Sequence, residues 1–233
     1  MLWLAVIASG AVTTSFLRAP LSNPAIGPAT FTAHRLGGLA VAALLVILLV
    51  RGRRPRLGAA LVGATAMTGL MAGRSLAPST TALHAWLAIV TAATLTAVTF
   101  PASSPGVRVR WTAIVAHLGL ILMVLQAAIG AMLRHRLSSL GWHVLLAGLA
   151  GLAVLVPAVS TLQSAAHGRR TLVCAAFAIA ATVTQVMLGT GVFVLMVTSN
   201  PTVTLWVSTT TAHIVFGTLT VVATAMFAAA LRA

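Results

Sequence analysis

Eight apolar runs follow one another along this chain, and each is long enough, or nearly long enough, to cross a membrane as a helix. A bilayer core of about 30 Å needs roughly 20 apolar residues in helical conformation. Transmembrane strands would be shorter and would alternate apolar with polar residues. The expected helices span residues 2–17, 33–50, 57–73, 81–100, 111–133, 142–162, 171–197 and 207–231. We therefore expect an all-α integral membrane protein.

The charged residues are all of one sign: the sequence has fourteen arginines and no Lys, Asp or Glu. The arginines lie between the apolar runs, which indicates membrane topology and contact with anionic headgroups rather than nucleic-acid binding. More of them fall on the side of the N-terminus than on the other side, so the positive-inside rule places both termini in the cytoplasm. We expect a protein of a bacterial plasma membrane.

The two halves of the sequence repeat a pattern of glycines and histidines. Gln-x-x-x-Gly occurs at 126–130 and 185–189, and 65–69 has the same spacing with Thr first. His34, His84, His143 and His213 belong to the second, fourth, sixth and eighth expected helices. Four crossings return the chain to its starting side, so we expect two parallel four-helix bundles, 1–104 and 105–233, related by a pseudo-twofold axis along the membrane normal.

The four repeated histidines are the candidate site. With the expected topology they all lie in the outer third of the membrane, His213 about 9 Å into its helix. Polar rings in lipid are costly unless they are paired or liganded, and paired imidazoles are the usual axial ligands of b-type haem in a helical bundle. Polar residues at headgroup level remain the alternative for each histidine. Zinc is disfavoured, since neither a carboxylate nor a second cysteine helps to complete a site.

Four arginines and two glutamines could support such a haem. Haem propionates need cationic partners, and Arg binds carboxylates bidentately. The candidates at the right depth are Arg35, Arg74, Arg134 and Arg136. Gln126 and Gln185 are candidates for hydrogen bonds across helices or beside a macrocycle, while their glycines give either close helix packing or room for a flat ring.

Three histidines and the single cysteine are assigned no ligand role. His117 is interpreted as a structural polar residue, and His135 and His167 as solvated loop residues, with support of a haem propionate as the alternative for His135. Cys174 lies within an apolar run and is expected to be a small core residue.

At the level of architecture nearly the whole chain resembles haem A synthase, the cytochrome oxidase assembly family. The resemblance rests on the two four-helix repeats, the histidines of the even helices, the "HR" pair at His34, and the stretch "QVMLGTGVFVL…TTTAHIVFGTLTVV". It implies that haem O is oxidised to haem A, with His34 and His84 as catalytic residues of the N-terminal substrate site. It implies haem b on His143 and His213, and a haem O synthase or a respiratory complex as partner.

One departure from the family bears on catalysis. The family commonly has a Glu three residues before its first His, and Phe31 occupies that place here. We therefore expect retained haem binding, with haem A formation absent or severely slowed. The alternatives are a b-type electron-transfer or accessory subunit on the same fold, with a second haem b in the N-terminal half, and a haem-free structural or transport subunit.

Overall fold

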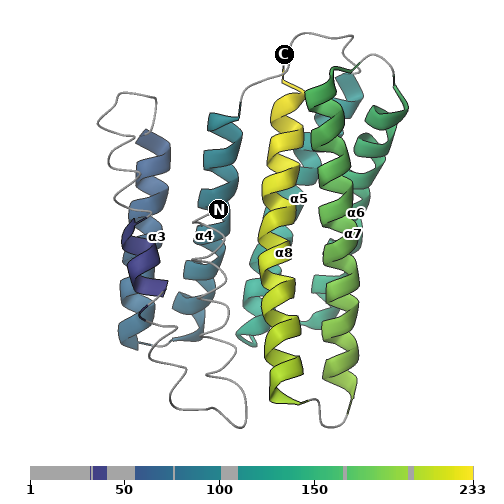
Figure 1. The fold of residues 1–233 in the computed structure, drawn as a ribbon. Helices are drawn as coiled ribbons and strands as arrows, with labels where there is room; N and C mark the ends of the chain where they lie inside the picture. The colour runs from purple at the N-terminus through teal and green to yellow at the C-terminus, as the bar shows by residue number, and fades with distance from the viewer. Residues whose placement is uncertain are drawn as a thin grey trace. The chain divides into compact units, whose positions relative to one another are not determined.

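The computed structural model describes residues 32, 34–40, 56–75, 77–100, 110–164, 167–198 and 202–232. All regular secondary structure in these residues is helical. The long helices are α3 (Arg56–Ser75), α4 (Pro78–Thr99), α5 (Arg110–Arg134), α6 (Leu140–Gln163), α7 (Arg169–Val197) and α8 (Val203–Ala230) (Figure 1). A further helical stretch, 34–40, falls within the expected second helix. The expected helix 2–17 lies outside the described residues.

The last six expected helices are confirmed, with ends that differ from the prediction by four residues or fewer. The largest difference is at the start of α8, where Thr202 Oγ accepts a 3.3 Å hydrogen bond from the Leu205 amide and starts the helix directly after Pro201. Pro78 likewise stands at the start of α4, where its missing N–H costs nothing.

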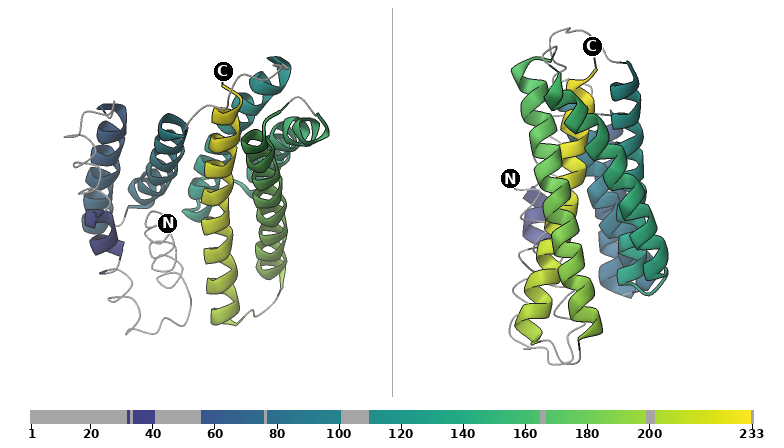
Figure 2. Two further views of the ribbon diagram at one scale, coloured as in Figure 1. Left: turned by 45° about the horizontal axis from the view of Figure 1, so that its top comes forward. Right: turned by 90° about the vertical axis from the view of Figure 1, so that its right-hand side faces the viewer.

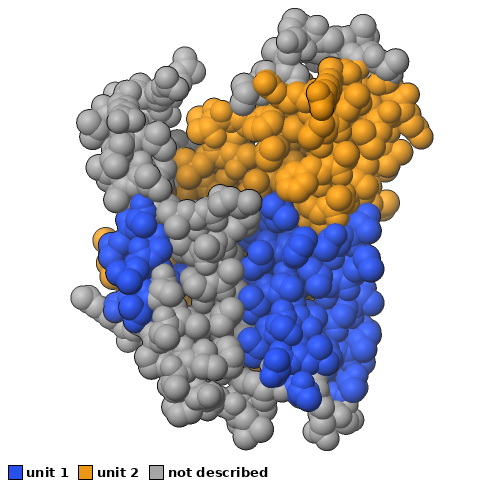
Figure 3. Space-filling model, viewed as in Figure 1, with its two compact units in different colours: residues 1–59, 183–219 blue, residues 60–182, 220–233 orange. Residues whose placement is uncertain are grey.

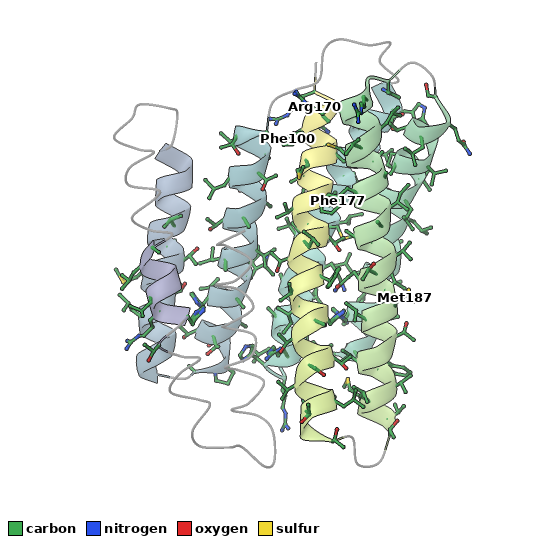
Figure 4. All side chains as sticks on the ribbon, in the orientation of Figure 1. Phe100, Arg170, Phe177 and Met187 are labelled. Carbon is green, nitrogen blue, oxygen red and sulfur yellow. The ribbon has the colours of Figure 1, made fainter. Side chains whose placement is uncertain are left out.

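Five of these helices, α4 to α8, are long and apolar enough to cross a membrane. Large apolar side chains lie on their outer faces: Met187 is 69% exposed (labelled in Figure 4) and Ile114 is 59% exposed. Such a surface would be costly in water but suits contact with lipid acyl chains. The described helices are therefore those of an integral membrane protein. In α3 the described apolar stretch is shorter, Val62–Met71.

The contacts divide the chain into two compact units, which Figure 3 colours separately. Unit 1 comprises Met1–Ala59 and Val183–Leu219, and unit 2 comprises Ala60–Thr182 and Thr220–Ala233. The division into 1–104 and 105–233, and the repeat that motivated it, stay predictions.

The core of unit 2 is built from small residues. Seven alanines of this unit are fully buried: Ala116, Ala150, Ala158, Ala175, Ala178, Ala223 and Ala225. Cys174 is 2% exposed in the same core, as predicted, and Phe100 and Phe177 pack against it (Figure 4). Helices α5 and α6 lie side by side and antiparallel (Figures 1 and 2). A Cβ added at Gly119 would lie 2.8 Å from the Ala153 carbonyl oxygen, so this approach requires glycine.

Interhelical hydrogen bonds join consecutive helices within unit 2. Three of them are Thr65 Oγ with Thr91 Oγ at 3.0 Å, Trp86 Nε1 donating to Val124 O at 3.0 Å, and Thr220 Oγ donating to Ala181 O at 3.1 Å. In lipid, helices gain little from apolar burial against each other, so close packing and bonds of this kind hold them together.

Candidate functional site

Three of the four repeated histidines place the imidazole directly on a glycine of the preceding helix. A Cβ added at Gly69 would lie 2.8 Å from His84 Cε1. The corresponding distances are 3.0 Å for Gly130 and His143, and 3.1 Å for Gly189 and His213. In each hairpin the ring thus occupies the space that a side chain at the glycine would need.

A polar group one helical turn before each glycine lies against the same ring. Gln126 Nε2 is 3.0 Å from Nδ1 and 3.4 Å from Nε2 of His143. Gln185 Nε2 is 3.5 Å from Nε2 of His213. Residues i and i+4 share one face of a helix, so the polar residue and the glycine meet the histidine together. We call such a set of polar residue, glycine and histidine an imidazole seat.

The imidazole seat of His84 uses a backbone group. His84 Nδ1 lies 2.9 Å from the carbonyl oxygen of Thr65, and the Thr65 hydroxyl instead meets Thr91. A carbonyl oxygen can only accept, so Nδ1 carries the hydrogen and donates it. In the neutral ring the lone pair then lies on Nε2. This is the tautomer that binds a metal through Nε2, and a carbonyl partner on Nδ1 is the usual support of such a ligand.

In the α7–α8 hairpin the contact is reciprocal. His213 lies on Gly189 of α7, while the Gln185 side chain lies on Gly217 of α8, where an added Cβ would be 3.0 Å from Gln185 Nε2. The role of Gly217 was not predicted from the sequence. A signal was present, because a small residue stands four positions after each of the other three histidines as well: Gly38, Ala88 and Ala147.

The histidines lie at different distances from the starts of their helices. His143 is three residues after Leu140, His84 six after Pro78, and His213 ten after Val203. At a rise of 1.5 Å per residue, His213 is about 15 Å along α8 rather than the expected 9 Å, because α8 begins four residues earlier. The expected common depth in the membrane stays a prediction.

The N-terminal members of the candidate site are described only in part. His34 is half-buried and Arg35 exposed at the start of the stretch 34–40. Gly10, which the predicted repeat pairs with Gly130, and Phe31 lie outside the described residues. Arg74 is in α3, but its side chain also lies outside the description.

Arg134 and Arg136 flank the turn between α5 and α6. Arg134 is half-buried at the end of α5, and Arg136 is exposed with a left-handed φ of 60°. Between them His135 is only 6% exposed, so the interpretation as a solvated loop residue was wrong. Its amide bonds to the carbonyls of Ala131 and Met132, which extends the helix end by a tight turn and carries the ring inward.

His117 satisfies Nδ1 within its own helix, by a 2.7 Å hydrogen bond to the carbonyl oxygen of Ala113. His167 is half-buried, and Arg170 is exposed in the first turn of α7 (Figure 4). Across the residues that the structure describes, no three His or Cys side chains come together as a metal site.

Comparison of the chain with protein-family models, with curated proteins and with solved structures finds no match.

Proposed function

We propose that this chain is a haem-binding membrane protein of the haem A synthase type, with haem ligated by imidazoles of His34, His84, His143 and His213. As the resemblance implies, His143 and His213 hold haem b in the C-terminal half. His34 and His84 hold haem O, haem A or a second haem b in the N-terminal half.

One observation carries the proposal: the hydrogen bond from His84 Nδ1 to the Thr65 carbonyl. It leaves the lone pair on Nε2, the nitrogen through which the ring would bind haem iron. It also fixes the plane of the ring.

The glycines support the same proposal. At Gly69, Gly130 and Gly189 a methyl group would already crowd the imidazole, so glycine is what lets each of these three candidate ligands lie directly against the preceding helix. This close contact would hold the ring in a fixed place for a ligand. The residues therefore fit the chemistry of an axially ligated haem, for which Arg35, Arg74, Arg134 and Arg136 would supply cationic partners for the propionates.

Bound haem would supply the redox chemistry, and the chain would orient it and neutralise its charge. Oxidation of a methyl group also needs protons to be moved, and general acid–base help is typically worth about 10² to 10⁴ in rate. No side chain in the sequence is a carboxylate, and Phe31 stands where the family has Glu. This favours the second candidate, a b-type cytochrome that carries electrons without producing haem A.

Visible spectra of single-histidine variants test the ligand assignment. We expect His143→Ala and His213→Ala to lose the low-spin b-type signal of the C-terminal half. His117→Ala is the control, because His117 lies outside the repeated pattern of histidines and its ring is bonded within its own helix, and it should keep the wild-type spectrum. Unchanged low-spin spectra in both ligand variants would refute the assignment. A haem-free wild-type chain would support the structural or transport alternative.

A further inference from the structure

The amide of Gln126 is only half satisfied. Its nitrogen lies 3.0 Å from His143 Nδ1, while its oxygen is buried and has no hydrogen-bond partner among the described residues. A buried polar atom without a partner costs about 1–3 kcal/mol. An amide in this position is therefore more than a packing residue, and its orientation has consequences for the ring that it faces.

A glutamine amide can present either of its two ends to an imidazole nitrogen. If the NH₂ group donates to His143 Nδ1, that nitrogen carries the lone pair and the hydrogen lies on Nε2. If the amide turns by half a rotation, Oε1 accepts from Nδ1–H, and the lone pair lies on Nε2. A ligand that binds Nε2 selects the second orientation.

We propose that Gln126 is a positioning residue that sets the tautomer and the ring plane of His143, and that its carbonyl accepts from Nδ1–H when the imidazole ligates iron. This inference rests on the proposed haem-binding function. It also predicts that the two imidazole seats of unit 2 control the tautomer of their histidines in different ways. The tautomer of His84 is fixed by the backbone of Thr65, whereas that of His143 depends on a side chain that can turn.

The two seats offer a matched pair of substitutions. Gln126→Met removes the amide but keeps an unbranched side chain of similar length. Thr65→Val replaces the hydroxyl of the corresponding residue in the α3–α4 seat by a methyl group and leaves the backbone carbonyl that His84 uses. Thr91, which loses its contact with the Thr65 hydroxyl, still donates to the Leu87 carbonyl at 2.7 Å. Only Gln126→Met should alter the tautomer of an imidazole.

The first readout needs no haem. In full-length protein labelled with ¹⁵N-histidine and reconstituted in micelles, the ring nitrogens report the tautomer directly. We expect Gln126→Met to change the His143 ring shifts. We expect His84 to show hydrogen on Nδ1 in both wild type and Thr65→Val. Unchanged His143 shifts in Gln126→Met would overturn the proposal, whatever the protein binds.

The second readout is the midpoint potential of the C-terminal haem. A stronger acceptor on Nδ1 makes the imidazole a better donor to iron and favours the oxidised state. Gln126→Met should therefore raise the potential, and Gln126→Glu should lower it below that of wild type. If both variants shift the potential in the same direction, Gln126 acts only through packing and the proposal fails. If no haem is bound at all, the proposed function fails, while the ring shifts still decide whether Gln126 sets the tautomer.

Discussion

The substitution Gly69→Ala tests whether the His84 ring lies directly against Gly69. The new Cβ would lie 2.8 Å from His84 Cε1 and 3.2 Å from Nδ1, so the ring must move. Its displacement weakens the 2.9 Å bond from Nδ1 to the Thr65 carbonyl. Overpacking typically costs about 1–3 kcal/mol, and loss of a hydrogen bond about 0.5–1.5 kcal/mol. The helix propensity of alanine returns about 1 kcal/mol, which leaves a net destabilisation of about 0.5–3.5 kcal/mol by these terms.

Gly63→Ala is the matched control in the same helix. Nothing lies within 4 Å of the Cβ that it would add. It should therefore be neutral or stabilising by up to about 1 kcal/mol, through helix propensity alone. The assay is reversible unfolding in mixed micelles, followed by circular dichroism, with ¹⁵N-histidine spectra of the folded state. If Gly69→Ala is as stable as Gly63→Ala and leaves the His84 ring signals unchanged, the ring does not lie on Gly69 and the reasoning is refuted.

Three further predictions address other parts of the account. Gly217→Ala should push the Gln185 amide toward His213, because the added Cβ would lie 3.0 Å from Gln185 Nε2. The ¹⁵N shifts of the His213 ring should then change, and those of His143 should not. Gly148→Ala adds a Cβ in open space, so a change of the His213 shifts in that variant would contradict this reasoning. In a Cys174→Ser background, Gly52→Cys should be labelled from the cytoplasmic side and Ser138→Cys from the outer side, and the reverse pattern would overturn the topology. Phe31→Glu should partly restore haem A formation in cells that supply haem O, measured by chromatography of extracted haems, whereas efficient production by the unmodified chain would show that the missing Glu does not matter.

The helices could be predicted because in this chain the ends of the apolar runs are marked by residues with a clear physical role. Arginines bound α5 and begin α7, and the expected bounds there differ by two residues or fewer. The starts of α4 and α8 were placed three and four residues too late. In both cases the missed turn follows or includes a proline, which favours the first turn of a helix, and its residues are less apolar than the rest of the run.

The site could be predicted only at the level of side-chain type. The shared spacing indicated that Gly69, Gly130 and Gly189 belong with histidines of the next helix. The partner of His84 could not be found in this way, because it is a backbone carbonyl, and every residue has one. Gly217 was missed because its role appears only when the α7–α8 contact is known. His135 was misjudged because a polar residue between two arginines suggests a solvated loop, whereas the turn buries it.

The most direct test of the central claim is the haem content of the purified, unmodified chain. It should be expressed in a bacterial membrane with a haem precursor supplied, extracted in mild detergent, and examined by visible spectroscopy and pyridine haemochrome analysis. The account predicts a Soret band, a b-type spectrum on reduction, and near-stoichiometric haem that remains bound through purification. A folded, monodisperse chain that carries no haem, and that binds none when haem is added, would contradict it.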